Sequence, residues 1–222
     1  NTTQIEICDG HDTDCDPSTS EEGMVSQSDW LGNLQDISSN FSTGTALSPA
    51  TYTHITPDVS LFFCEGTHFV NLSVEESTEI IGKGSNVILS GGGVGPVIYT
   101  RDHLDLENLT LQDGLGMTDA NGYQVGGGLS CASIFTGYGI PNIYISNVLF
   151  TNNSADIGGG IGVHSNSYCD IWVDRSEFNA NTATWGGGIG LLYGELEVSF
   201  TTLSNNTATG GGALYVWPPS NQ

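Results

Sequence analysis

The sequence predicts an all-β fold, a parallel β-helix in which short strands wind into stacked coils. The strongest indication is a repeat, because FTNNSADIGGGIGV from Phe150 recurs as FNANTATWGGGIGL from Phe178 and as LSNNTATGGGALYV from Leu203. The copies start 28 and 25 residues apart, with a fainter copy at 126–129. A repeat of this period indicates one supersecondary unit that stacks on its neighbours.

The segments before the repeats predict strands. LDLENLTL (104–111), IYISNVLF (143–150), IWVDRSEF (171–178) and LEVSFTTL (196–203) align without a gap. Their first and third positions are always apolar, which predicts strands with these positions facing inward. The alternation breaks before the last apolar position, so each coil is expected to bend between two short strands.

Asparagine, alanine and glycine recur at the predicted corners. Asn153, Asn181 and Asn206 each precede an alanine by two residues, and glycines follow. Asparagine tolerates left-handed backbone and its amide can hydrogen-bond to its copy one coil away, while glycine permits positive φ and close backbone approach. Leucine-rich and helical repeats fit worse, because the sequence has neither a fixed leucine comb nor long amphipathic helices.

These residues resemble a known class of repeats. The string F/L-x-x-N-x-A-x-x-G-G-G-I is similar to the repeats of polymorphic outer-membrane proteins and of right-handed parallel β-helix surface proteins. The stretch CEGTHFVNLSVEESTEIIGKGSNVILSGGGVGPVI (64–98) is similar to the first coils of that class, so the resemblance covers roughly residues 58–217. The resemblance implies a right-handed coil on a cell surface, whereas the motif residues themselves only build corners and core.

The N-terminal stretch EICDGHDTDCDPSTSEEG (6–23) resembles a Cys-Asp-Gly-x-Asp-x-Asp-Cys-Asp motif associated with metal binding in secreted surface proteins. An irregular loop can turn its alternating carboxylates onto one cation, and hard oxygen ligands favour Ca²⁺. The candidate ligands are Asp9, Asp12, Asp14, Asp16, Glu21 and Glu22. Pro17 and Gly23 stand where an EF-hand needs Gly and Glu, so an EF-hand is not predicted.

Two cysteines bracket this acidic segment. In an oxidising exterior, a disulfide between Cys8 and Cys15 would hold the carboxylates together. The alternatives are a soft-metal site of Cys8, Cys15 and His11, or an acidic tail without an ion. The other cysteines allow three pairings with one thiol left over, or stay buried as free thiols: Cys64, Cys131 and Cys169.

A capping helix is expected between the acidic segment and the coils. SDWLGNLQDISSNF (28–41) places its apolar residues on one helical face, with Ser28 or Asp29 as N-cap. Such a helix would cover the exposed edge of the first coil. The chain is thus expected to comprise an acidic metal-binding segment (1–27), a cap and linker (28–57) and a parallel β-helix (58–222).

The charge balance excludes some partners. Three basic residues against 25 acidic residues give a formal net charge of −22. Such a field repels nucleic-acid phosphates and anionic lipids, and it attracts cations and suits a saline or calcium-containing exterior. No apolar run is long enough to span a bilayer, so no membrane insertion is expected. A chain that begins with Asn1 suggests a mature secreted or cell-surface protein without its signal peptide.

The last coil motivates a structural role. ALYVWPPSNQ runs from a strand into Pro218 and Pro219, which either blunt the edge or leave it for the next copy of the chain to cover. A head-to-tail contact that does not close generates a filament. We therefore expect a structural or adhesive protein that binds itself or other surface proteins. A monomer and a fragment of a longer solenoid are the alternatives.

The runner-up is a carbohydrate-binding or carbohydrate-active β-helix. The outward second position of the aligned strands is Asp105, Tyr144, Trp172 and Glu197, an aromatic pair between two acids. This pattern is typical of a sugar-binding strip, and equally of an aromatic ladder that stabilises the stack.

No catalytic residue is predicted, although pectate lyases and polygalacturonases are also β-helices. A lyase needs a basic residue near calcium, and the chain offers only Lys83, Arg101 and Arg175. Arg175 is expected to form surface ion pairs. An acid cluster of Asp102, Asp105 and Glu107 lies near His103, before the longest insertion, 113–125. Because the chain is rich in acids throughout, a solvated surface is expected there. The paired-aspartate and Gly-His-Gly signatures of the glycosidases are also missing.

Overall fold

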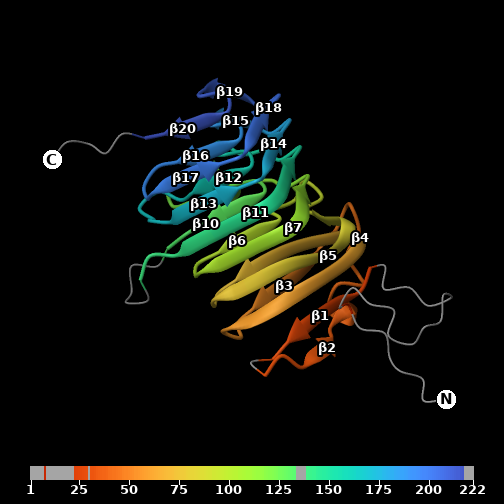
Figure 1. Ribbon diagram of the computed structural model, residues 1–222. Coiled ribbons are helices and arrows are strands. Elements are labelled where there is room, and N and C mark those ends of the chain that lie inside the picture. Colours follow the sequence, from red (N-terminus) through yellow and green to blue (C-terminus); the bar gives the residue numbers. More distant parts are fainter. Residues whose placement is uncertain (1–7, 9–22, 30, 134–138, 218–222) are drawn as a thin grey trace, which may run out of the picture.

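The predicted parallel β-helix is confirmed by a computed structural model, which describes residue 8 and residues 23–29, 31–133 and 139–217. Figure 1 shows strands of successive coils lying side by side from the N-terminal to the C-terminal end of the stack. Within the described residues there is no α-helix, and the single helical turn is the 3-10 segment η1 (Ser38–Asn40).

Two walls of parallel strands enclose the core. The first wall consists of β4 (Val59–Val74), β5 (Thr78–Ser90), β7 (Leu104–Gln112), β11 (Asn142–Thr151), β13 (Asp170–Asp174) and β17 (Leu196–Ser199). The second wall consists of β3 (Ala50–His54), the end of β4, β6 (Ile98–Thr100), β10 (Leu129–Cys131), β12 (Ile161–Val163), β16 (Ile189–Leu191) and β20 (Leu214–Val216). Because β4 contributes to both walls, they form one continuous, strongly curled sheet.

Shorter strands complete the coils and the edges. In the last two coils the first wall continues, after the bend, as β14 (Glu177–Asn179) and β18 (Thr202–Ser204), and β15 (Thr182–Trp185) pairs with β19 (Thr207–Gly210) on a third side. Two antiparallel hairpins are attached to the stack, β1 (Val25–Ser28) with β2 (Leu34–Asp36) and β8 (Met117–Thr118) with β9 (Gln124–Val125).

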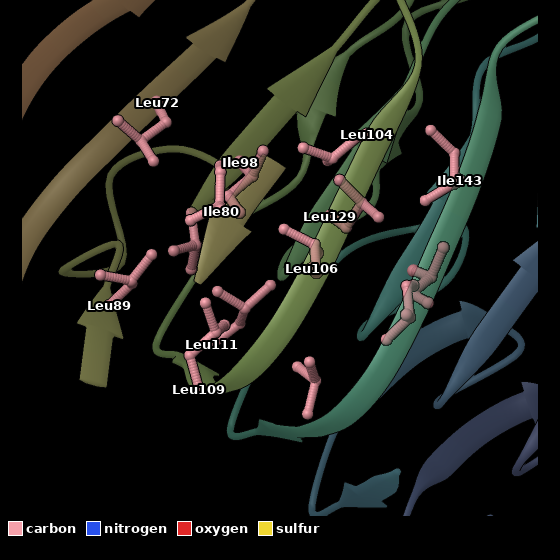
Figure 2. Close-up of a cluster of buried hydrophobic side chains, with 14 of the residues drawn as sticks. Leu72, Ile80, Leu89, Ile98, Leu104, Leu106, Leu109, Leu111, Leu129 and Ile143 are labelled. Atoms are coloured by element: carbon pink, nitrogen blue, oxygen red, sulfur yellow. The ribbon is translucent and has the colours of Figure 1, made fainter. Parts of the chain in front are cut away.

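The expected core positions face inward. The strand register aligns Leu104 with Ile143 and Ile171, and all three are fully buried. Figure 2 shows Leu104, Leu106 and Leu111 of the first wall in one cluster with Ile98 and Leu129 of the second wall. Farther along the stack the rings of Phe150 and Phe178 stack with their centroids 4.5 Å apart. Burial of this continuous apolar column is the main drive for stacking the coils.

At the predicted bend, the residues in equivalent positions of successive coils have a left-handed backbone conformation. Asn108, Asn147, Arg175 and Phe200 occupy equivalent places in successive coils, with φ between 44° and 57°. This conformation reverses the alternation of inward and outward side chains, which explains why the apolar period breaks there. Asparagine adopts it readily, whereas Arg175 and Phe200 are held in it by the strands on either side.

A ladder of asparagine side chains runs through the next corner. The Nδ2 amide of Asn153 donates to Oδ1 of Asn181, and that of Asn181 donates to Oδ1 of Asn206, both at 3.0 Å. Each amide also donates to a backbone carbonyl of the preceding coil, as Asn181 does to Phe150 O at 2.9 Å. Asn153 and Asn181 are buried, so the predicted coil-to-coil amide bonds satisfy groups that water cannot reach.

The glycine corner allows the coils to approach closely. A Cβ atom on Gly159 would lie 2.5 Å from the carbonyl oxygen of Gly187 and 2.6 Å from that of Thr182. Both oxygens belong to the following coil, so any side chain at Gly159 would push the coils apart. The repeated glycines therefore fix the coil spacing.

The cap is a β-hairpin, and the predicted capping helix over 28–41 is wrong. β1 pairs antiparallel with β4, where Val25 faces Phe63, and thereby covers the edge of the first coil. Oδ1 of Asp29 accepts from the backbone N–H groups of Leu31 and Asn33, and Gly32 has a φ of 82°. Asp29 therefore closes a tight turn where the helical pattern suggested an N-cap, and Gly32 interrupts the helix.

The predicted Cys8–Cys15 disulfide is also wrong, because Cys8 pairs with Cys64, with 5.5 Å between the Cα atoms. The second disulfide joins Cys131 to Cys169, one of the pairings that the sequence left open. Both close loops between distant parts of the chain, 56 and 38 residues apart. Cross-links of this kind restrict the unfolded chain and are typical of proteins outside the cytoplasm.

Three histidines are buried in the fold. Nε2 of His68 donates to the carbonyl oxygen of Cys64 at 2.9 Å, and Nε2 of His164 lies 2.8 Å from the hydroxyl of Ser130. Nε2 of His54 has no hydrogen-bond partner among the described residues. Burial is the main cause that lowers the pKa of His54, His68 and His164.

These histidines predict that acid weakens the fold. An unfolded histidine has a pKa of about 6.5, and the buried rings titrate lower. Between the unfolded and the folded pKa, the unfolded chain binds more protons than the folded protein. The stability that the buried neutral histidines contribute is therefore fully present above about pH 6.5 and is lost as the pH falls toward the folded pKa. Urea unfolding between about pH 7.5 and 5.5 should show a falling free energy of unfolding. His68→Gln, which keeps a donor for Cys64, should flatten this dependence; a free energy that is constant or rises toward acid would contradict it.

Candidate functional site

The four predicted outward residues lie in one column on the first wall. The register places Asp105 beside Tyr144, Tyr144 beside Trp172, and Trp172 beside Glu197. Two further residues extend this outer column toward the N-terminus, because Glu79 lies beside Asp105 and Ser60 beside Glu79. The outer column thus consists of Ser60, Glu79, Asp105, Tyr144, Trp172 and Glu197.

The aromatic pair of the outer column is a stack. The ring centroids of Tyr144 and Trp172 lie 4.7 Å apart and the ring planes differ by 16°. One face of each ring therefore covers the other, and the free face of Tyr144 lies on the side of the shorter Asp105 side chain. Tyr144 is 47% exposed, and it lines a groove together with Asp105.

A groove of about 420 Å³ opens beside Tyr144. The outer column contributes Ser60, Glu79, Asp105 and Tyr144 to its lining. His103 and Asn142 line it from the strand ends of β7 and β11. The groove combines one aromatic face with carboxylate, hydroxyl, imidazole and amide groups, a composition typical of a site for a polar small molecule.

Hydrogen bonds within the groove orient its polar groups. The Ser60 hydroxyl donates to Oε2 of Glu79 at 2.6 Å. The backbone N–H of Asn142 donates to Nδ1 of His103 at 2.8 Å, so the neutral imidazole carries its proton on Nε2. The groove therefore offers carboxylate acceptors together with an imidazole donor.

The carboxyl of Asp105 is electrostatically perturbed. Burial raises its pKa, the nearby Glu79 carboxylate raises it further, and His103 acts in the opposite direction. No lysine or arginine lines the groove. Arg101 pairs with Glu75 at 3.4 Å, and the ion pair expected for Arg175 is confirmed, with Asp174 at 2.8 Å. The lining of the groove thus carries carboxylates and a histidine, without a lysine or arginine.

The other predicted acidic residues differ in position. Asp102 accepts the backbone N–H of His103 through Oδ1 at 2.7 Å, and Glu107 accepts from the Asn108 amide at 3.1 Å. Neither lines the groove, so only Asp105 of the expected acid cluster contributes to it.

The predicted calcium ligands and Cys15 lie outside the described residues: Asp9, Asp12, Asp14, Asp16, Glu21 and Glu22. The structure does describe both ends of their segment. Cys8 is bonded to Cys64, and the backbone N–H of Gly23 donates to the carbonyl oxygen of Glu65 at 2.7 Å. Cys8 and Gly23 are therefore attached to adjacent residues of β4. Among the described residues, no group of three or more His, Cys, Asp or Glu side chains could hold a metal ion.

Comparisons with protein-family models, with curated proteins and with solved structures found no match for this chain. The relation to surface-protein repeats therefore stays a resemblance. In the part of the chain that the structure describes, no helix is long and apolar enough to cross a membrane.

The last coil exposes apolar side chains, with Val198 38% and Val216 49% accessible. The head-to-tail filament stays a prediction.

Proposed function

We propose that this protein is a structural and adhesive solenoid of the cell exterior that binds neutral carbohydrate in the groove beside Tyr144. The observation that carries the proposal is the free face of Tyr144 next to the carboxylates of Asp105 and Glu79. An aromatic face packs against the apolar C–H face of a pyranose, and carboxylates accept hydrogen bonds from its hydroxyl groups. The two disulfides support an oxidising location.

The charge of the groove favours a neutral glycan over an acidic one. Uronic acids and sulfated sugars would meet Asp105 and Glu79 without a lysine or arginine to balance them. Neutral hydroxyls can instead donate to the carboxylates and accept from the Nε2–H of His103. The proposed function of the groove is binding, and the proposal gives none of its residues a catalytic role.

Replacement of the ring tests the groove directly. Tyr144→Ala should weaken binding of neutral oligosaccharides about tenfold, because it removes the stacking face, whereas Tyr144→Phe should bind nearly as well as the unaltered protein. The measurement is a glycan array followed by titration calorimetry, with uronic-acid oligosaccharides as the charged comparison.

Two results would contradict the groove proposal. One is that the unaltered protein binds no neutral glycan. The other is that Tyr144→Ala lowers the thermal stability but leaves glycan binding unchanged, because the aromatic pair then only stabilises the stack.

We also propose that the acidic segment binds Ca²⁺. The attachment of its two ends to adjacent residues, Cys64 and Glu65, supports this. A cation bound between these attachment points would relieve the mutual repulsion of the segment's carboxylates. The residues that would hold the ion are the six carboxylates between Asp9 and Glu22.

Metal analysis checks the calcium proposal. After dialysis against calcium, the full chain should retain the ion and gain thermal stability, because ligand binding to the folded state stabilises it. Asp12→Asn with Asp14→Asn should abolish both effects, while Asp105→Asn in the groove should preserve them. Retention of calcium by the double variant, or no retention by the unaltered protein, would refute this site.

A further inference from the structure

A second cavity, of about 250 Å³, lies at the C-terminal end of the stack and is rich in aromatic rings. Five aromatic side chains line it: Tyr123, Trp185, Tyr193, Tyr215 and Trp217. Tyr123 comes from the turn of the β8–β9 hairpin, Trp185 from β15 and Tyr215 from β20. We call this cavity the aromatic cage.

The rings of the aromatic cage face in different directions. Tyr123 and Trp185 meet at 85° with their centroids 5.6 Å apart, and Tyr215 and Trp217 meet at 68° with their centroids 6.0 Å apart. These arrangements differ from the stacked pair of the outer column. Rings in several orientations around one cavity suit a compact, rounded group better than they suit a flat sugar ring.

The hairpin that supplies Tyr123 is held in place by a carboxylate. Oδ1 of Asp119 accepts the backbone N–H groups of Asn121 at 2.8 Å and Tyr123 at 3.0 Å, and Oδ2 accepts the hydroxyl of Ser165. Asn121 and Ser165 both line the cage. The buried Asp119 therefore holds the turn that carries Tyr123 in place before any ligand arrives, and its carboxylate contacts residues of the lining.

The electrostatics of the cage favour a cation. The electron-rich faces of tryptophan and tyrosine attract positive charge, and no lysine, arginine or histidine lines the cage. The formal net charge of −22 adds a favourable long-range field. The cage lining also contains no carboxylate, so a strongly hydrated ion such as Na⁺ would lose its water without replacement.

We propose that the aromatic cage binds a methylated ammonium group, of the kind carried by choline, betaines and trimethylated lysine. Its methyl groups fit an apolar, ring-lined cavity, and its charge interacts with the ring faces. This ligand class differs from the neutral glycan proposed for the groove, and the two sites lie on different parts of the coil surface.

Choline chloride is the probe, and its uncharged carbon isostere 3,3-dimethyl-1-butanol is the matched ligand control. Titration calorimetry at constant ionic strength should show saturable, one-to-one binding of choline, and at least about fivefold weaker binding of the isostere. Trp217→Leu and Tyr123→Leu, both at exposed positions, should each weaken choline binding about fivefold or more. Trp172→Leu, which alters the outer column, should leave it unchanged.

Circular dichroism on each variant checks that the fold is retained. Equal binding of the isostere would overturn the proposal, since it would mean that shape without charge is recognised. A lack of saturable choline binding to the unaltered protein would also overturn it. So would a loss of choline affinity in Trp172→Leu equal to that in Trp217→Leu, or tighter binding of a neutral monosaccharide than of choline in the cage.

Discussion

The fold depends on one constraint: Asn153 and Asn181 are buried at the coil corners, and only the neighbouring coils can satisfy their amides. Asn181 shows this most fully, since its side chain bonds to Asn153 on one side, to Asn206 on the other, and to the Phe150 carbonyl. A shift of one residue between coils would leave these groups unpaired in the interior, at about 1–3 kcal/mol each. The asparagine ladder therefore fixes the register, and the apolar column supplies most of the stabilisation.

A fixed register determines where surface chemistry can be placed. Residues at equivalent positions are stacked at the spacing of neighbouring strands, so the outer column brings together side chains far apart in the sequence, such as Glu79 and Tyr144. The groove lies where the short side chain of Asp105 stands beside the large side chain of Tyr144. The aromatic cage instead depends on a departure from the repeat, the hairpin inserted between β7 and β10, which places Tyr123 against Trp185.

Features that repeat could be predicted from the sequence, and features that occur once could not. The inward positions, the corner asparagines and the outer column from Asp105 to Glu197 follow from aligning the copies. Glu79 was not predicted, because β5 contains extra residues between Ile81 and Ile88 and so does not align without a gap with the later strands. The cap and the Cys8–Cys64 disulfide depend on the pairing of β1 with β4, for which a single sequence gives no signal. The cage escaped notice because its rings occupy unequal positions in different coils.

The most direct test of the register constraint is the free energy of unfolding of Asn181→Ala, compared with Thr182→Ala at the exposed neighbouring position. The first variant strands the Phe150 carbonyl and the amide of Asn153 in the interior, so it should lose ~2–5 kcal/mol. The second should change by less than about 0.5 kcal/mol, as is usual for exposed positions. Equal, small losses for the two variants would show that the ladder does not hold the coils in register.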